Sequence, residues 1–227
     1  MKPILTILLL LLTTTSFAQK MSYNQWKREA QTEMRLIPKF GNYPKTEAQE
    51  KADKELIKTY LAQEGSNRKA SELLVKLGFD YFYKSDLKTA MMRFNQAWLL
   101  DPGNENVFWG FGAIYFHFED KENAIKQYDE GLKLNSKSSN LLTDKATIYM
   151  NSYMKNGTES DYVTALKLLK KSYLVDTRNQ STLFKMSVLY FMKKDCQNAF
   201  KYYRECQALG GRVITRDYTL ALTQQCK

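Results

Sequence analysis

Residues 71–104 carry the sequence SELLVKLGFDYFYKSDLKTAMMRFNQAWLLDPGN, which decides the fold. In its second half, Asp86 precedes Ala90 by four positions, and Phe94 follows Ala90 by four more. This spacing places apolar side chains on one face of a helix. Asp86 stands where a carboxylate can accept hydrogen bonds from the free N–H groups of a first helical turn. The segment therefore predicts a helix that begins near Asp86.

The pattern that starts at Asp86 occurs four times along the chain. Each aspartate is followed four positions later by an alanine, namely Ala90, Ala124, Ala165 and Ala199. Successive alanines are 34, 41 and 34 residues apart, so the period is 34 and the third unit carries an insertion. An upstream helix in each unit is marked by Tyr81, Tyr115, Tyr149 and Tyr190. We predict four helix-turn-helix repeats, at residues 71–104, 105–138, 139–179 and 180–213.

The residues of this repeat follow a known family pattern. Repeat one has large, Leu-Gly, Tyr, Ala, Phe, Ala and Pro residues in register, namely Leu74, Leu77, Gly78, Tyr81, Ala90, Phe94, Ala97 and Pro102. In this it resembles the tetratricopeptide repeat (TPR) proteins. The later repeats lack the proline, and Lys145 replaces a leucine in repeat three. The resemblance implies an all-α fold, a right-handed superhelix of antiparallel helix pairs, and a role as an interaction surface.

The segments on both sides of the array are predicted to be helical. Within residues 19–70 we expect helices at 23–37 and 46–63, which flank the first repeat. After the array, a helix at 215–225 within residues 214–227 is expected to cap the last repeat, since terminal repeats expose an apolar face. The extra residues of repeat three, 150–160, are expected to form a surface insertion.

Residues 1–18 have the pattern of a secretory signal peptide. A basic start precedes an apolar run at 4–12, and Ser16 and Ala18 supply the small residues that a signal peptidase requires. The run is too short for a membrane span, which needs about 20 residues. The residue directly after the expected cleavage point is Gln19 and not a cysteine, so we do not expect a lipid anchor. We expect an exported chain, periplasmic or secreted, that starts at Gln19 and does not span a membrane.

The charge and composition of the chain restrict the kinds of partner and of chemical activity that we expect. The net charge of +10 could attract nucleic acid or an anionic surface, but the basic residues are dispersed and the chain is expected to be exported. We therefore predict a protein or peptide partner and no nucleic acid. A single histidine, His117, and three cysteines offer little for catalysis or metal binding. We expect no enzymatic activity, no cofactor and no metal.

The three cysteines suggest one disulfide. Cys196 and Cys206 are ten residues apart in one predicted helix, which separates them by about 15 Å along its axis and prevents a bond. A cap that runs antiparallel to this helix brings Cys226 beside Cys196. We predict a Cys196–Cys226 disulfide, as suits an oxidising compartment, and a free thiol at Cys206. Three free thiols remain the alternative.

The resemblance to TPR proteins also assigns a binding face. The first helix of each repeat has a second apolar side, which in that family lines a concave groove for peptide ligands. The residues carried over to this groove are Val75, Phe79, Phe82, Trp109, Ala113, Phe116, His117, Thr143, Thr147, Met150, Phe184, Val188 and Phe191. The chaperone-binding members grip a carboxylate with basic and amide side chains, whereas this groove is aromatic. We expect an apolar peptide ligand instead.

Several alternatives stay open for this aromatic groove. The N-terminal segment, with Trp26, Met34, Leu36 and Phe40, could cover it. A second copy of the chain in a homodimer could do the same. The ligand could also be a carbohydrate or a small apolar molecule of the cell envelope, because aromatic rings stack on sugar faces. The leading hypothesis is an exported scaffold for protein–protein interaction.

Overall fold

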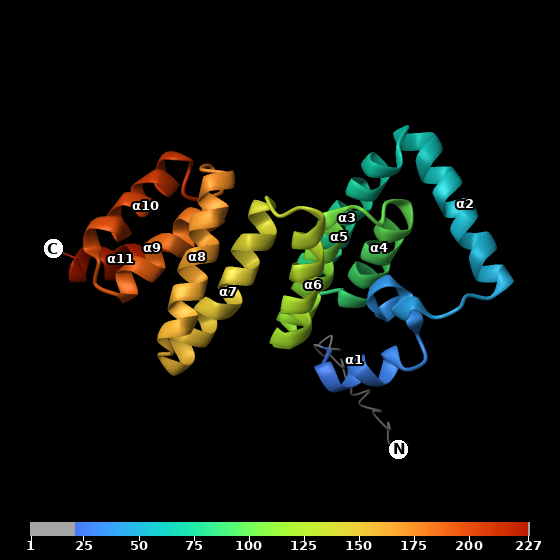
Figure 1. Cartoon of the computed structure of the whole chain (residues 1–227), viewed down its shortest axis with the longest axis horizontal. Helices are drawn as coiled ribbons and strands as arrows, with labels where there is room; N and C mark the ends of the chain where they lie inside the picture. The colour runs from blue at the N-terminus through green and yellow to red at the C-terminus, as the bar shows by residue number, and fades with distance from the viewer. Residues whose placement is uncertain (1–20, 227) are drawn as a thin grey trace, which may run out of the picture.

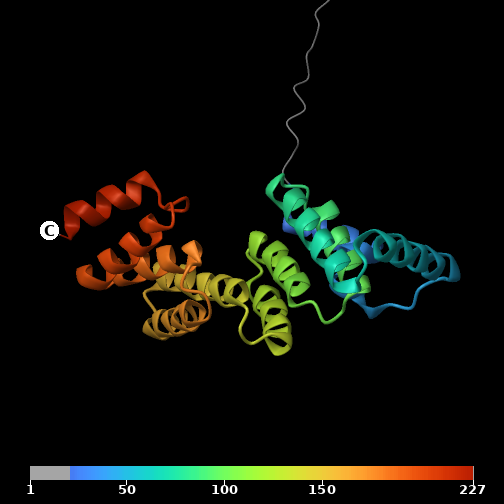
Figure 2. The ribbon, with the colours of Figure 1, turned by 90° about the horizontal axis from the view of Figure 1, so that it is seen from above.

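The computed structural model describes residues 21–226, and all regular structure among them is helical. Antiparallel helix pairs stand side by side in an elongated array, with α2 (Glu47–Glu64) at one end and α11 (Arg216–Gln225) at the other (Figures 1 and 2). The predicted all-α solenoid is confirmed. Among the described helices, none is long and apolar enough to span a bilayer. The predicted signal peptide, 1–18, lies outside the described residues.

Each repeat consists of an inner helix followed by an outer helix. The inner helices are α3 (Asn67–Tyr83), α5 (Glu105–His117), α7 (Ser139–Asn156) and α9 (Gln180–Met192). The outer helices are α4 (Leu87–Leu100), α6 (Lys121–Leu134), α8 (Glu159–Val175) and α10 (Cys196–Ala208). Each inner helix packs against its own outer helix and against the inner helices on either side.

Glycine allows the helices of repeats one and two to approach closely. A Cβ atom at Gly78 or at Gly110 would lie 2.4 Å from the ring of Phe94, which is fully buried between α3 and α5. A Cβ atom at Gly112 would lie 2.2 Å from the ring of Tyr128. The small residues of the repeat pattern are therefore places where an aromatic ring lies directly on a helix backbone.

The tyrosine and the aspartate of the pattern form the turn within a repeat. The backbone N–H of Asp86 donates to the carbonyl of Tyr81 at 3.0 Å, and Asp120 and Asp195 make the same bond in repeats two and four. The residue before each of these three aspartates has a left-handed backbone conformation, with a φ of 63° at Ser85. This geometry ends the inner helix and lets the aspartate side chain cap the outer one.

Repeat three departs from this turn. We expected Asp161 to start its outer helix, but α8 starts at Glu159, so Asp161 lies within the first turn. The extra residues of repeat three are helical and mostly exposed, since α7 and α8 have 18 and 17 residues, against 13 and 14 in repeat two. The extra residues lengthen both helices. Lys193 pairs with Glu159 and thereby fastens the extended hairpin to repeat four.

The segment before the array is broken where one helix was expected at 23–37. Helix α1 (Tyr23–Ala30) stops early, and two short 3-10 helices follow, η1 (Met34–Leu36) and η2 (Pro38–Asn42). The segment that replaces the second half of the expected helix packs on α4. The buried side chain of Asn95 donates its amide N–H groups to the carbonyls of Arg35 and Ile37, at 2.8 and 2.9 Å, and the side chain of Leu36 between them is buried.

The C-terminal helix α11 covers repeat four. Cys196 and Cys226 are joined by a disulfide with their Cα atoms 5.4 Å apart, which is the pair expected from the sequence. Cys206 is a free and buried thiol, and burial raises its pKa. Leu222 of α11 is fully buried, so the cap holds the end of the solenoid both by packing and by a covalent bond.

Candidate binding face

The inner face of the array is built from one side of helices α3, α5, α7 and α9. Sequence reasoning placed all of its candidate residues on this face as a single groove. The structure divides them into three groups: side chains that are buried in packing, side chains that α11 covers, and an aromatic group on repeats one and two that solvent reaches.

The first group is buried and supports the face from below. Ala113 and Met150 are 7% and 8% exposed, and Val75 and Phe79 are similarly enclosed. Thr143 is 1% exposed because its hydroxyl is within 2.6 Å of Thr182 Oγ1 in a polar cluster between helices. Nothing in the spacing of the residues distinguished these positions from their exposed neighbours. They are corrected here from ligand contacts to packing residues.

The second group lies under the cap. The ring of Tyr218 on α11 packs edge-on against Phe184 and Phe191, with centroids 5.3 and 5.7 Å apart. Its hydroxyl is 2.6 Å from Ser187 Oγ, and burial raises the pKa of Tyr218 to about 12. Val188 belongs to the same cluster. The inner face of repeat four is therefore partly occupied by the protein's own C-terminal helix.

The third group forms what we call the aromatic patch: Phe82, Tyr83, Trp109, Phe116 and His117. Tyr83 is 74% exposed, and the other four side chains are half-buried. The rings of Phe82 and His117 are 5.8 Å apart in an edge-on arrangement. Partial desolvation and the nearby carboxylate of Asp144 raise the pKa of Tyr83 above its ordinary value, and its hydroxyl is neutral at physiological pH, as that of a free tyrosine is. The patch thus presents uncharged aromatic edges and faces.

Trp109 is fixed in place from two sides. Its ring centroid is 4.2 Å from that of Phe79, and its indole N–H donates to Asp144 Oδ2 at 2.7 Å. Asp144 comes from α7 of the next repeat and also lies 3.9 Å from the ammonium group of Lys185. The orientation of this ring therefore depends on three consecutive repeats.

The N-terminal segment does not cover the aromatic patch. Trp26 is buried with its ring 5.2 Å from that of Phe118, and Tyr23 donates to the carboxylate of Asp120 at the start of α6. The segment that follows packs on α4, an outer helix. Figure 1 shows α1 beside the α4 and α6 end of these hairpins. Of the open alternatives, coverage by Met34, Leu36 or Phe40 is not the arrangement in this structure.

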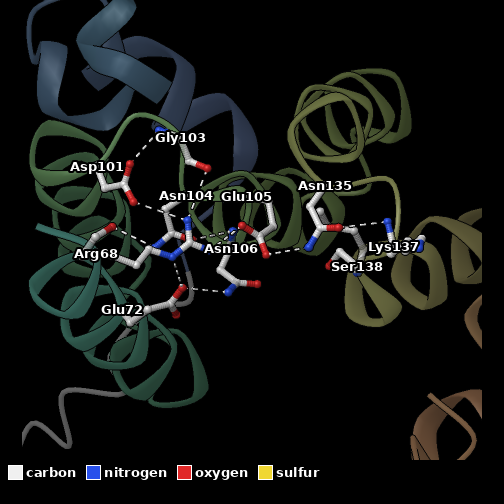
Figure 3. A network of polar contacts seen from close by, with 12 residues as sticks. Arg68, Glu72, Asp101, Gly103, Asn104, Glu105, Asn106, Asn135, Lys137 and Ser138 are labelled. Atoms are coloured by element: carbon white, nitrogen blue, oxygen red, sulfur yellow. Dashed lines mark hydrogen bonds and ion pairs between the residues drawn. The ribbon is translucent and has the colours of Figure 1, made fainter. Parts of the chain in front are cut away.

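A polar network between repeats was not anticipated from the sequence. Figure 3 shows Arg68 among the carboxylates of Glu72, Asp101 and Glu105, with N–O distances of 3.3, 3.3 and 2.5 Å. Asn135 of the next turn donates to Glu105 at 2.9 Å. Burial opposes ionisation of Glu105, but the hydrogen bonds from Arg68 and Asn135 hold its pKa below the usual value. The network joins the helix ends of neighbouring repeats.

The 34-residue period contains a signal for this network. The first position of each predicted repeat makes a polar contact near the end of that repeat: Asn104, the N-cap of α5, donates to Ser71 at 2.8 Å, and Asn179, the N-cap of α9, donates to Ser139 at 2.8 Å. In repeat four, Gln180 donates to the carbonyl of Leu209 at 2.8 Å. A polar residue recurring at an otherwise apolar helix start marks these inter-repeat contacts.

The described residues offer no assembled metal site. Within residues 21–226, no three or more His, Cys, Asp or Glu side chains are arranged so that they could hold a metal ion. His117 packs edge-on against Phe82 and Phe118. Its neighbours are thus aromatic, and it belongs to the aromatic patch.

Comparison with known proteins supports the fold. No family model and no curated protein matches the sequence. Among solved structures, the chain is similar to PilF of Pseudomonas aeruginosa, with a TM-score of 0.57 and 13% identity over 70% of this chain and 68% of that chain. It is also similar to the TPR protein TTC0263 of Thermus thermophilus, with a TM-score of 0.56 and 14% identity over 68% of this chain and 80% of that one.

A third similar structure is yeast Tom70, with a TM-score of 0.51 and 19% identity over 89% of this chain and 42% of Tom70. Identities this low establish a common fold and nothing further. With the helix pairs and the repeat pattern already described, they show that this protein has the fold of a TPR solenoid. A solenoid of this kind presents an extended surface built from successive repeats.

Proposed function

We propose that this protein is an exported, non-enzymatic scaffold that binds a protein partner through the aromatic patch of repeats one and two. The observation that carries the proposal is the contrast along the inner face. Tyr83 is 74% exposed beside half-buried aromatic neighbours, whereas in repeat four Phe184 and Phe191, which are also half-buried, have the ring of Tyr218 packed against them. An exposed aromatic cluster on a rigid helical scaffold is typical of a recognition surface.

The chemistry of the patch favours an apolar or aromatic peptide segment. Its rings supply large contact areas with little loss of side-chain freedom on binding. Asp144 and Lys185 are the nearest charges described above, and they lie 3.9 Å apart, so they offset one another. A partner that binds here therefore gains little from a charged terminus and much from burying apolar side chains.

A photo-crosslinking amino acid placed at Tyr83 in living cells tests this proposal. We expect covalent capture of one protein partner at Tyr83 and none at Leu174, which is 82% exposed on α8 and serves as a control of equal accessibility. The substitution Phe116→Glu should abolish the capture while the helical circular dichroism spectrum is retained. Equal capture at both positions, or capture that survives Phe116→Glu, would show that the aromatic patch is not the binding site.

Export requires a separate test. The proposal of an exported chain rests on residues 1–18, with their basic start and short apolar run. The intact mass of the protein recovered from the exported fraction should correspond to a chain that starts at Gln19. Recovery of the full-length chain from the cytoplasm alone would contradict export and leave the binding proposal standing.

A further inference from the structure

The chain before α2 contains an unusual left-handed turn. Lys39, Phe40, Gly41 and Asn42 have φ values of 56°, 55°, 66° and 55°. Residues other than glycine rarely adopt this conformation, and then singly rather than in a run. Such strain persists only where surrounding contacts impose it, and it gathers at binding and catalytic sites.

The contacts that impose this turn come from α4. Asn95, fully buried, accepts the N–H of Phe40 through its Oδ1 at 3.4 Å and donates to the two carbonyls that precede the turn. Lys45 lies over the Phe40 ring, with its ammonium 3.7 Å from the centroid. The turn is thus held through both its backbone and the Phe40 side chain.

A cavity of about 710 Å³ lies beside the turn, on the outer side of repeat one. This volume falls within the range of pockets that hold small ligands or inserted side chains. It is open to solvent on one side and lies between α2, α4 and the turn segment. Its apolar lining consists of Ala30, Met34, Phe40, Tyr43, Ala52, Leu56 and Met92, and its polar lining consists of Gln31, Thr32, Glu33, Arg35, Lys45, Gln49, Asp53 and Gln96.

The turn also places an aromatic ring at the edge of the cavity. A Cβ atom at Gly41 would lie 2.6 Å from Cε2 of Tyr43, so the Tyr43 ring lies directly on the glycine backbone. Tyr43 is nevertheless 60% exposed. The strained backbone therefore positions one large aromatic ring that solvent can reach and a second, Phe40, within the wall.

The charged groups around the cavity are already paired. Arg35 lies 2.5 Å from Glu33, and Lys45 pairs with Asp53. These four side chains sum to zero charge, so the cavity has no preference for an ion. The carboxamide of Gln96 at the cavity wall accepts from Arg93 through its oxygen at 2.9 Å, and its N–H donors remain for a ligand carbonyl.

We infer that this cavity binds the bulky apolar side chain of a short, uncharged peptide segment, at a site distinct from the aromatic patch. Met34 and Met92 are flexible and polarizable, so they can adapt to aliphatic or aromatic side chains. Gln96 can bond a main-chain carbonyl of the same segment. The Lys39–Asn42 turn keeps the cavity formed before the ligand arrives, which lowers the entropy lost on binding.

The site can be tested with an uncharged fluorophore, N-phenyl-1-naphthylamine, added to the full chain. We expect saturable fluorescence enhancement and its reversal by the blocked peptide Ac-Gly-Leu-Phe-Gly-NH2, with no reversal by Ac-Gly-Ser-Ser-Gly-NH2. Absence of enhancement would overturn the site. Enhancement that the apolar peptide does not reverse, or that both peptides reverse equally, would overturn the assignment to apolar peptide side chains.

Two variants locate the binding. Met92→Trp should fill the cavity and weaken binding of the fluorophore by about tenfold or more, a change of about 1.4 kcal/mol. Met154→Trp, at an exposed methionine on α7, is the matched control and should leave binding unchanged. Tyr43→Ala removes an exposed ring and should also weaken binding, so the test survives if Met92→Trp fails to fold. If Met92→Trp folds and both it and Tyr43→Ala bind the fluorophore as the wild type does, the fluorophore binds elsewhere and the inference is refuted.

Discussion

The indole N–H of Trp109 donates to the carboxylate of Asp144 at 2.7 Å, across the boundary between repeats two and three. This bond joins α5 to α7 and sets the orientation of the central ring in the aromatic patch. Neither residue is part of the repeat pattern. The bond therefore belongs to what is particular to this protein within a common fold.

Substitutions at Asp144 should show what this bond contributes. Asp144→Leu leaves the half-buried indole N–H without its acceptor, and we expect the free energy of unfolding to fall by about 1 to 2 kcal/mol. Asp144→Asn retains an acceptor oxygen and should lose less, since the ion pair with Lys185 is long and partly exposed. Urea unfolding followed by circular dichroism measures both. Equal losses in the two variants would show that the charge, not the hydrogen bond, matters.

The disulfide between Cys196 and Cys226 should stabilise the C-terminal end of the array. It closes a loop with a sequence separation of 30, which in the chain-entropy model contributes about 3.6 kcal/mol. A double substitution of both cysteines by serine should therefore lower the unfolding midpoint and speed hydrogen exchange in α11. The wild type treated with dithiothreitol should behave like the double variant, and the double variant should not respond to dithiothreitol. Loss of protection spread evenly over all repeats would contradict a local role.

Gly112 should not accept a side chain. Its Cβ would lie 2.2 Å from the ring of Tyr128, which is fully buried and cannot move freely. We expect Gly112→Ala to lower stability by at least about 1 kcal/mol, in spite of the better helix propensity of alanine. Gly103→Ala is the control, because Gly103 lies in an exposed turn where the new Cβ meets only Asp101 Oδ1, at 3.2 Å. Thermal unfolding of the two variants should separate them clearly.

Stability should decline in acid because of Glu105. Arg68 and Asn135 hold its pKa in the folded chain below the ordinary value, so its contribution is complete above the pKa of the unfolded chain. The contribution is lost as the pH falls through the folded-state pKa. We expect urea midpoints to fall below about pH 4. Glu105→Gln should show a shallower decline between pH 7 and pH 3 than the wild type, whereas Glu122→Gln, on the exposed face of α6, should follow the wild type.

The repeat organisation could be predicted from the sequence because its causes are local. The gap of five residues between Tyr81 and Asp86 is the span of a helix end, where the N–H of Asp86 reaches back to the carbonyl of Tyr81. Helical periodicity then assigned Phe94 to the interior, where it is fully buried. The pairing of Cys196 with Cys226 followed from an antiparallel arrangement of two neighbouring helices.

The exposure of the candidate binding residues could not be predicted in the same way. Thr143 and Phe82 both lie on inner helices at positions of the expected groove, but Thr143 is enclosed by polar groups of the next repeat and Phe82 is not. Exposure depends on which neighbour packs over a side chain, and that neighbour differs from repeat to repeat. Tyr218 covers Phe191 for this reason, although no periodicity links the two.

The sequence by itself determined the solenoid of four helix pairs, the turns of repeats one, two and four, and the C-terminal cap, since these depend on residues within a few turns of one another. Only the tertiary structure decided which aromatic rings face solvent and where the N-terminal segment lies. That segment was expected to be one helix, but its second half forms 3-10 turns that pack on α4, where Asn95, 60 residues away, donates to the carbonyl of Arg35. Contacts of this range leave no mark in local spacing, so they become visible only when the chain is folded.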